Sequence, residues 1–264
     1  MTSRPYQRDY SKHFSAVLDG KKKTEQGLRL AAVMEAAGCG GPGPALDLGC
    51  SAGFNTKELC RLFDFVVGFD LDQHAVRLAR ERLPPGGALL IADGLRLPFR
   101  SGVFKAILCS QVHEHVPDPA PLVAEIERVL AGDGVICLGA TNRWIVMEPH
   151  YRLPLLSWLP RRLADLYLRR FRGIDHYYEN LLSYGQLRRL FAGFRIEDFS
   201  LRMVQDPERF HCRDLVRPYA ALAKLPGALL RLLLPLFPSF VWILRKRDGE
   251  TRTVGHEAFR AETM

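Results

Sequence analysis

The sequence lacks the cysteine patterns and the leader that mark zinc-binding and secreted proteins. Its six cysteines, at positions 39, 50, 60, 109, 137 and 212, form no C-x-x-C pair and show no metal-ligand spacing. Several lie in apolar runs, where cysteine behaves as a small hydrophobic residue. The first 23 residues are polar and basic and do not resemble a secretory signal. We therefore expect a cytoplasmic protein with reduced thiols and no metal site.

Long uninterrupted hydrophobic runs are also missing. The longest apolar stretch, residues 225–244, is broken by Arg231 and by prolines at 226, 235 and 238. Because a membrane-spanning helix needs about 20 apolar residues without such breaks, this stretch is not predicted to span a bilayer. It could still lie on a membrane surface. The sequence contains no internal repeat and no low-complexity tract.

The first half of the chain carries no net charge. Residues 1–142 carry equal numbers of basic and acidic side chains, so the net charge of +8 arises from residues 143–264. A hydrophobic content of 47% over 264 residues indicates a globular protein that can bury a sizeable core. Any surface for an anionic partner is expected in the second half.

Short apolar runs alternate with amphipathic segments along most of the chain. Strands are predicted at 45–48, 65–69, 88–91, 104–109, 134–139, 194–201 and 240–244, and helices at 24–37, 55–63, 73–83, 119–131 and from 183 onward. This alternation predicts an α/β fold with a doubly wound, mostly parallel sheet of seven strands. We expect one domain, 1–264, with an N-terminal helical segment at 1–40. Helical insertions are predicted at 142–180, after strand five, and at 205–237, between strands six and seven.

Three acidic residues follow three successive predicted strands. Asp47 opens a glycine turn between a strand and a helix, Asp70 comes 23 residues later, and Asp93 follows the third strand. A carboxylate at Asp70 can accept both hydroxyls of a ribose. Asp47 would repel a pyrophosphate but suits an ammonium group such as that of a methionyl tail, and Asp93 can accept the amine of adenine. Together they indicate an adenosyl cofactor.

Glycines beside these acids would let the cofactor approach the backbone. Gly49 and Gly53 supply close approach and unusual φ values in the first turn, and Gly94 can approach the adenine ring. Ser51 stands where a third glycine would be easiest.

The order and spacing of these motifs resemble the class I S-adenosylmethionine-dependent methyltransferases, of the methyltransferase type 11 kind that includes ubiquinone-pathway enzymes. The matching segments are LDLGCSAG (46–53), VVGFDLD (66–72), IADGLRLPF (91–99), FKAILCSQVHEHVPDP (104–119), VLAGDGVICLGATNRW (129–144) and a late strand at 193–201. The resemblance implies a Rossmann-like sheet and S-adenosylmethionine as cofactor. It also implies that Asp47, Gly49 and Cys50 line the methionyl part, Asp70 the ribose, Leu71 the adenine face, Asp93 and Gly94 the adenine edge, and Gln111 the pocket floor. Ser51, in place of the usual middle glycine, departs from the pattern.

Three other motif interpretations are weaker. The segment 49–53 fits the G-x-S-x-G elbow of α/β-hydrolases, but only one strand can precede it, whereas that fold places several strands before its nucleophile. The G-x-G-x-x-G spacing of nicotinamide dehydrogenases is absent. A zinc interpretation of His113-Glu-His115 fails because H-E-x-x-H sites need histidines on adjacent helical turns.

Methyl transfer needs a general base only when the acceptor must lose a proton, as a hydroxyl would. We name His115 and His150 as the catalytic candidates. His115 matches an E-H pair of the family, although a structural role is the alternative, and His150 lies just beyond strand five, where the acceptor pocket should open. The other candidate bases are His113, His176, Tyr177 and Tyr178.

The 142–180 insertion contains a basic amphipathic segment. Leu163, Tyr167 and Phe171 share a helical face at 153–172, with five arginines around it. Such a segment can lie on the inner face of an anionic membrane, or it can be a lid over the active site. We expect a small-molecule or lipid-like acceptor and, in the first instance, O-methylation. Nucleic acid is a weaker alternative because no RNA-binding module accompanies the arginines. A cofactor-binding or membrane-associated protein without turnover is the alternative function, and the oligomeric state stays open.

Overall fold

The computed structural model describes residues 5–13, 19–217 and 225–247. Seven strands form one sheet in the order β3-β2-β1-β4-β5-β7-β6. The strands are β1 (Gly41–Leu48), β2 (Phe63–Asp70), β3 (Gly87–Ile91), β4 (Phe104–Ser110), β5 (Leu130–Thr141), β6 (Phe194–Asp198) and β7 (Ser239–Lys246). The first five pair in parallel, and β7 runs antiparallel to both β5 and β6. The predicted α/β fold with a mostly parallel seven-stranded sheet is confirmed.

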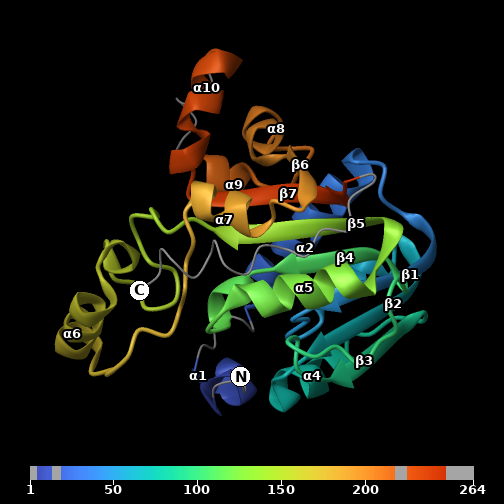
Figure 1. Ribbon diagram of the computed structural model, residues 1–264, viewed down its shortest axis with the longest axis horizontal. Coiled ribbons are helices and arrows are strands. Elements are labelled where there is room, and N and C mark those ends of the chain that lie inside the picture. The colour runs from blue at the N-terminus through green and yellow to red at the C-terminus, as the bar shows by residue number, and fades with distance from the viewer. Residues whose placement is uncertain (1–4, 14–18, 218–224, 248–264) are drawn as a thin grey trace.

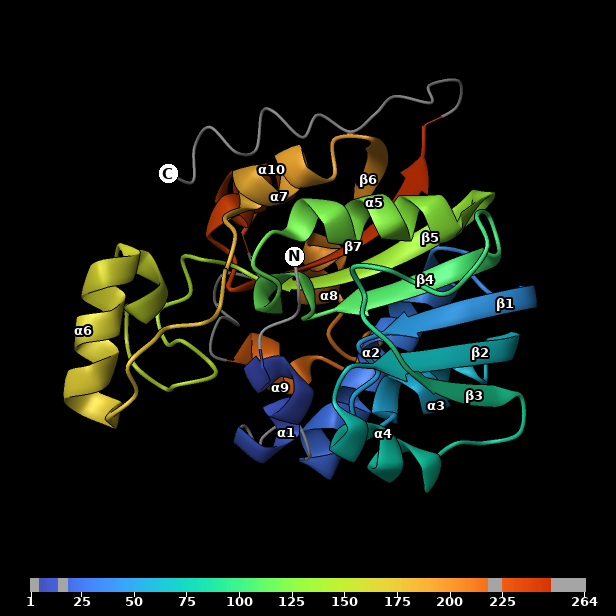
Figure 2. The same ribbon diagram turned by 60° about the horizontal axis from the view of Figure 1, so that its bottom comes forward.

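Helices cover both faces of the sheet (Figure 1). They are α1 (Tyr10–His13), α2 (Gly20–Ala36), α3 (Phe54–Leu59), α4 (Gln73–Arg80), α5 (Pro119–Val129), α6 (Arg161–Arg172), α7 (Tyr184–Leu190), α8 (Ser200–Gln205), α9 (Arg213–Val216) and α10 (Gly227–Leu233). Short 3-10 turns occur at η1 (Pro5–Asp9), η3 (His113–His115), η4 (Leu156–Trp158) and η7 (Leu234–Leu236). The segment with α6 stands at one side of the molecule, apart from the helices that cover the sheet (Figures 1 and 2).

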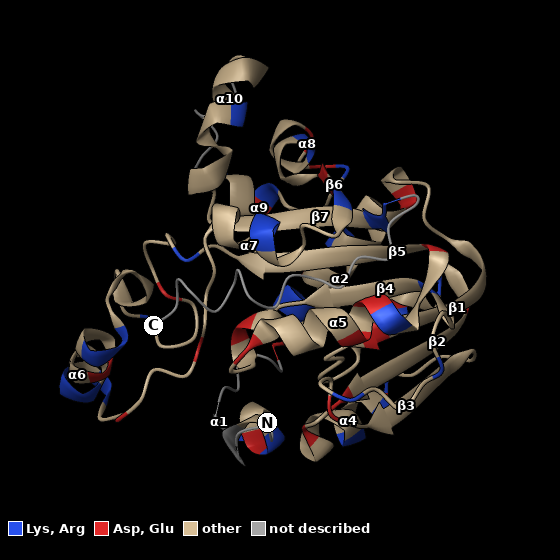
Figure 3. Ribbon diagram, in the orientation of Figure 1, with Lys and Arg blue, Asp and Glu red and all other residues tan. Residues whose placement is uncertain are grey.

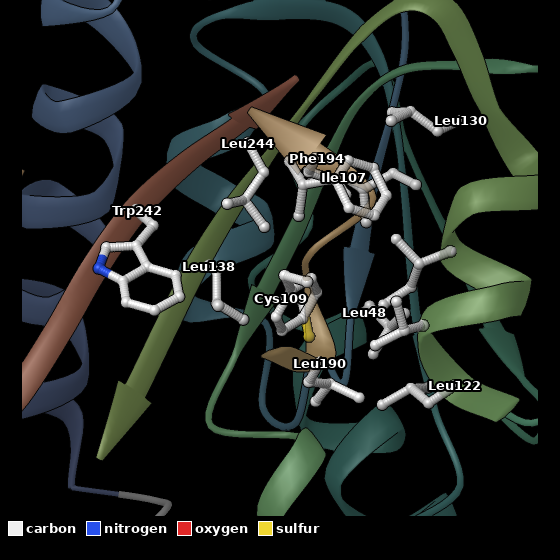
Figure 4. Packing of buried hydrophobic residues seen from close by; sticks show 14 of the residues in the cluster. Leu48, Ile107, Cys109, Leu122, Leu130, Leu138, Leu190, Phe194, Trp242 and Leu244 are labelled. Carbon is white, nitrogen blue, oxygen red and sulfur yellow. The ribbon is translucent and has the colours of Figure 1, made fainter. Parts of the chain in front are cut away.

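The core divides into two layers because successive side chains of a strand point to opposite faces. In β4, Ile107 and Cys109 pack with α5 and α7, whereas Ala106 and Leu108 pack with α2, α3 and α8. Figure 4 shows the first layer, in which Leu122 of α5 and Leu190 of α7 meet the strand residues. Burial on both faces explains the near-continuous apolar runs of the central strands.

Several element boundaries differ from those expected. The predicted 194–201 strand ends at Asp198, because Asp198 accepts the N–H of Ser200 at 2.9 Å and α8 begins there. The predicted helices 55–63, 73–83 and 119–131 are shorter and end at Leu59, Arg80 and Val129. The predicted capping box is confirmed: Ser183 and Gln186 cap each other at the start of α7.

Helices and 3-10 turns occur in both segments for which insertions were predicted. The 142–180 segment holds η4 and α6, and the 205–237 segment holds α9, α10 and η7, with residues 218–224 outside the described part of the chain. No helix within the described residues is long and apolar enough to cross a membrane.

Candidate functional site

A cavity of about 640 Å³ opens at the carboxyl ends of the parallel strands. Its walls include Gly49 after β1, Asp70 at the end of β2, Asp93 after β3 and Gln111 after β4. The chain reverses its winding direction between β1 and β4, which are neighbours in the sheet. Ligands of doubly wound sheets bind at such a switch point, so the topology itself places the cavity.

The turn after β1 is built for close backbone approach. Gly49 has a φ of +74°, and a Cβ added there would lie 2.6 Å from Cγ2 of Val112. Ser51 also adopts a left-handed φ of +47°, so the departure from glycine is accommodated in the conformation that glycine would favour. Cys50 lines the cavity, and burial raises the pKa of its thiol.

Gly53 adopts the unusual φ predicted for it, at a position beside the cavity wall. It caps α3 with a φ of +79° and is not among the residues that line the cavity. A Cβ at this position would lie 2.9 Å from Cβ of Ala79, so glycine here lets α3 pack closely on α4.

Asp70 ties the first two turns of the site together. Its carboxylate accepts the N–H of Ser51 at 2.8 Å and the N–H of Asp72 at 2.9 Å. Burial raises the pKa of Asp70, and these hydrogen bonds partly offset that effect. Leu71 lines the cavity beside it. The side chain is therefore held at the cavity wall, at the end of the strand that was predicted to present it.

Asp93 and Gly94 lie further along the same wall. The Asp93 carboxylate accepts the N–H of Leu95 at 3.0 Å and stays half-buried. Gly94 packs under Leu122, which would lie 3.1 Å from an added Cβ. Both predicted adenine-edge residues thus reach the cavity.

Asp47 lies behind the turn rather than at the cavity surface. Its carboxylate is 1% exposed and accepts the hydroxyl hydrogen of Thr56 at 2.6 Å. Burial raises the pKa of Asp47 to about 7, although Thr56 acts in the opposite direction. Of the three predicted acids, Asp70 and Asp93 share one cavity wall, and Asp47 does not line it.

Gln111 marks the end of β4 on the cavity floor. It adopts a φ of +59°, its N–H donates to the carbonyl of Gly139 at 2.9 Å, and its side-chain oxygen accepts from Thr141 at 2.7 Å. These contacts join β4 to β5 and fix the side chain beside the cavity.

Another part of the cavity wall comes from α2, which sequence reasoning did not assign to the site. Lys22, Lys23, Gln26 and Arg29 all line the cavity. Gln26 donates to the hydroxyl of Ser110 at 3.0 Å, and burial lowers the pKa of Lys23. The i, i+4, i+7 spacing of 22, 26 and 29 was the available signal, since it places these polar residues on one helical face.

Both predicted catalytic histidines line the cavity, with their ring centroids 5.2 Å apart. Burial lowers the pKa of His115, and the nearby His150, His113 and Lys23 lower it further. Burial also disfavours the charged form of His150, but the hydrogen bond and charge of Glu148 outweigh it, so the pKa of His150 is raised. The two imidazoles therefore favour opposite protonation states.

The remaining candidate bases lie elsewhere. His113 is fully buried, Tyr177 is buried, and His176 is exposed with its Nδ1 3.7 Å from Asp165. None of these, nor Tyr178, lines the cavity. No cluster of three or more potential metal ligands occurs among residues 5–13, 19–217 and 225–247.

The cavity wall fits an adenosyl cofactor with a cationic sulfonium. Two carboxylates, a glycine in a left-handed conformation and a row of backbone groups at strand ends suit a nucleoside. Residues 46–138 match a family described as a methyltransferase domain.

Proteins of known function resemble this chain over part of its length. It is 27% identical over 147 residues to 2-methyl-6-phytyl-1,4-hydroquinone methyltransferase of Synechocystis, covering 53% of this chain and 45% of the relative. It is 28% identical over 131 residues to ubiquinone biosynthesis O-methyltransferase of Methylococcus capsulatus, covering 46% and 54%. The matching part thus spans about half the length of these curated relatives.

A solved structure shares the fold over most of the chain. The plantazolicin methyltransferase BpumL, in complex with a monoazolic desmethylPZN analog and SAH, superposes with a TM-score of 0.57 at 16% identity, covering 92% of this chain and 91% of that one. The domain match, the two relatives and the seven-stranded sheet point the same way. Residues 46–138 therefore carry a methyltransferase domain, in a chain with the seven-stranded sheet of the class I S-adenosylmethionine-dependent methyltransferases.

Proposed function

We propose that this protein transfers the methyl group of S-adenosylmethionine to a hydroxyl of a small-molecule or lipid-like acceptor. The observation that carries the proposal is one cavity that is lined both by Asp70 and Asp93 and by the pair His115 and His150. A cavity that holds both the carboxylates suited to a nucleoside and a candidate base can align a methyl donor with a hydroxyl. The curated relatives, named for a hydroquinone and for ubiquinone biosynthesis, support such an acceptor class.

Each part of the cofactor has a candidate partner in this chain. Asp70 would hold the ribose, Asp93 and Gly94 the adenine edge, and the turn at Gly49 and Cys50 the methionyl part. The cationic residues Lys22, Lys23 and Arg29 on α2 suit the methionyl carboxylate. When bound, the cofactor supplies an activated methyl group, so the protein mainly aligns the reactants and excludes water.

Calorimetry and product analysis together test this function. We expect S-adenosylmethionine to bind with one site per chain, and S-adenosylhomocysteine to accumulate with a panel of phenols, hydroquinones and alkyl alcohols. A protein that binds the cofactor but releases no product with any acceptor would favour the alternative, a non-catalytic cofactor-binding protein. Absence of cofactor binding would reject both.

A membrane surface is our proposal for where a lipid-like acceptor is met. In α6 the side chains Ala164 and Leu168 are buried, which leaves Leu163, Leu166 and Phe171 more than half exposed. The neighbouring exposed apolar residues are Trp144, Val146, Met147, Leu155, Trp158 and Ile174. Arginines lie on the same helix (Figure 3). An apolar surface with cations around it suits the inner, anionic face of a membrane bordering the cytoplasm.

Vesicle sedimentation tests this location. We expect binding to phosphatidylglycerol-containing vesicles, weaker binding to pure phosphatidylcholine, and a loss of at least about tenfold when Leu163, Leu166 and Phe171 are all replaced by serine, because apolar area and charge both contribute. Val103→Ser, an exposed apolar residue in the turn before β4, is the matched control. Equal binding of the triple variant and the wild type would contradict the proposal.

A further inference from the structure

A fully buried carboxylate stands behind one of the two cavity histidines. Glu148 lies in the loop after β5 and has no exposed surface. Its Oε1 lies 2.7 Å from Nδ1 of His150, and its Oε2 accepts the backbone N–H groups of His150 and Tyr151 at 2.8 and 2.7 Å. The carboxylate is therefore fixed by its own turn and cannot swing away from the imidazole.

This contact fixes the tautomer and the direction of the imidazole. A carboxylate on Nδ1 favours the form in which Nδ1 carries the hydrogen, and the basic nitrogen is then Nε2, on the far side of the ring. The His150 ring itself lines the cavity. The same relation between a buried acid and a histidine orients the base in many hydrolytic sites.

Three rings surround this part of the cavity. The centroid of Tyr10 lies 4.7 Å from that of His115 and 6.5 Å from that of His150, and the two histidines are 5.2 Å apart and nearly perpendicular. Both pairs that include His150 are edge to face, whereas the rings of Tyr10 and His115 are tilted by 55°. A planar acceptor group suits such surroundings.

We propose that Glu148 is a positioning residue that holds His150 as the proton acceptor for a hydroxyl seated among Tyr10, His115 and His150. The proposal rests on the methyltransferase function proposed above and adds to it the base, its positioning residue and the part of the cavity where the acceptor lies. Glu148 itself does not line the cavity and acts only through His150.

The proposed reaction balances with the acceptor hydroxyl, His150 and the methyl donor. The hydroxyl proton passes to Nε2 of His150, a bond forms between the acceptor oxygen and the methyl carbon, and the carbon–sulfur bond breaks with its electron pair left on sulfur. The products are a methyl ether, a thioether and one proton, which His150 later releases to solvent. The step changes no oxidation state, so it needs no oxidant or reductant.

The charges around His150 set the direction of its pH dependence. Besides Glu148, the groups near it are Glu179 before α7, Glu114 and His115 on η3, and Tyr10 on α1. The carboxylates raise the pKa of His150, whereas burial lowers it. Because the base must be unprotonated, turnover is expected to rise with pH through that pKa. Removing the Glu148 charge should move this rise to lower pH.

The test compares Glu148→Gln, Glu148→Asp and His150→Gln with wild type, using S-adenosylmethionine with catechol and with an aliphatic alcohol of similar size. We expect Glu148→Gln to lower kcat by about 10- to 100-fold and His150→Gln by about 100-fold or more, with KM changed by less than about threefold. Glu148→Asp should recover part of the loss. His176→Gln, a histidine near a carboxylate outside the cavity, is the control and should stay within about twofold.

Two readouts separate positioning from mere structural support. In Glu148→Gln the pH at half-maximal kcat should fall by about one unit, and the NMR titration of the His150 ring, which needs no acceptor, should shift in the same direction. An unchanged titration and pH profile would overturn the proposal even while the wild type turns over. If Glu148→Gln does not fold, the His150→Gln variant provides the test. A rise of kcat with pH that persists in His150→Gln would also overturn the proposal.

The same experiment distinguishes a failure of the proposed methyltransferase function from a failure of the proposed role of His150. Wild-type protein that binds no S-adenosylmethionine would reject the methyltransferase itself. Methylation of amines or carbons, with every hydroxyl acceptor inert, would leave the methyltransferase standing and overturn the role of His150 as base.

Discussion

Asp70→Ala is expected to weaken S-adenosylmethionine binding by about 1.5 to 3 kcal/mol, which is roughly a tenfold to 150-fold rise in Kd. Two effects act together. The variant loses the carboxylate that would accept the ribose hydroxyls, and it removes the partner of the N–H groups of Ser51 and Asp72. The second effect loosens the turn that must approach the cofactor. Calorimetric titration of both proteins measures the change.

A cofactor analogue separates these two effects. If Asp70 binds the ribose, an S-adenosylmethionine analogue without the 2′-hydroxyl should lose affinity for the wild type and lose little further affinity for Asp70→Ala. Asp64→Ala, an exposed acid at the other end of β2, is the matched control and should bind like the wild type. Unchanged affinity in a folded Asp70→Ala protein would reject the ribose assignment.

The order and type of the sheet elements could be predicted because strands buried on both faces have continuous apolar runs in the sequence. The run 106–109 of β4 is apolar at every position since alternate residues enter two different cores. Boundaries were less predictable where a local hydrogen bond decided them. Phe199 and Leu201 look like strand residues, yet the Asp198 contact to Ser200 starts α8.

The part of the cavity wall that would bind the nucleoside was also predictable, because parallel strands bring their carboxyl ends to one edge of the sheet. Asp70, Leu71, Asp93 and Gly94 reach that edge through local sequence order alone. The contribution of α2 to the cavity depends instead on how this helix crosses the sheet, and no short sequence motif indicates that crossing. The segment around Glu148 and His150 was expected near the acceptor, but their pairing depends on a loop conformation that the sequence did not reveal.

Asp47→Asn is expected to make the cofactor-free protein more stable at pH 8, by about 2 to 4 kcal/mol. Burial raises the pKa of Asp47 to about 7 from an ordinary value of 3.8, and each unit corresponds to about 1.4 kcal/mol. Asparagine can still accept the hydroxyl of Thr56, but it carries no buried charge. The free energy of unfolding, from urea titrations, measures the gain.

The sign of the pH dependence follows from the same shift. Between about pH 4 and pH 7 the unfolded chain releases the Asp47 proton while the folded chain keeps it, so this residue lowers the stability of the wild type as pH rises through that window. The raised pKa of Asp70 acts in the same direction in both proteins and largely cancels in their difference. The stability gap between Asp47→Asn and wild type should therefore be near zero at pH 4 and reach its full size above pH 7.

Cofactor binding should reduce the stability difference between Asp47→Asn and the wild type. If the carboxylate of Asp47 compensates the cationic methionyl group through the turn, Asp47→Asn should bind S-adenosylmethionine about five- to tenfold more weakly at pH 8, and saturating cofactor should narrow the stability gap. Asp64→Asn, which changes an exposed acid of β2, controls for net charge. A variant that is less stable than wild type without cofactor would show that the buried Asp47 charge does not destabilise the folded chain. A variant that binds the cofactor as well as wild type would show that this charge does not contribute to the site. The opposite outcome would mean that the fold retains an unfavourable buried charge because the bound cofactor compensates it.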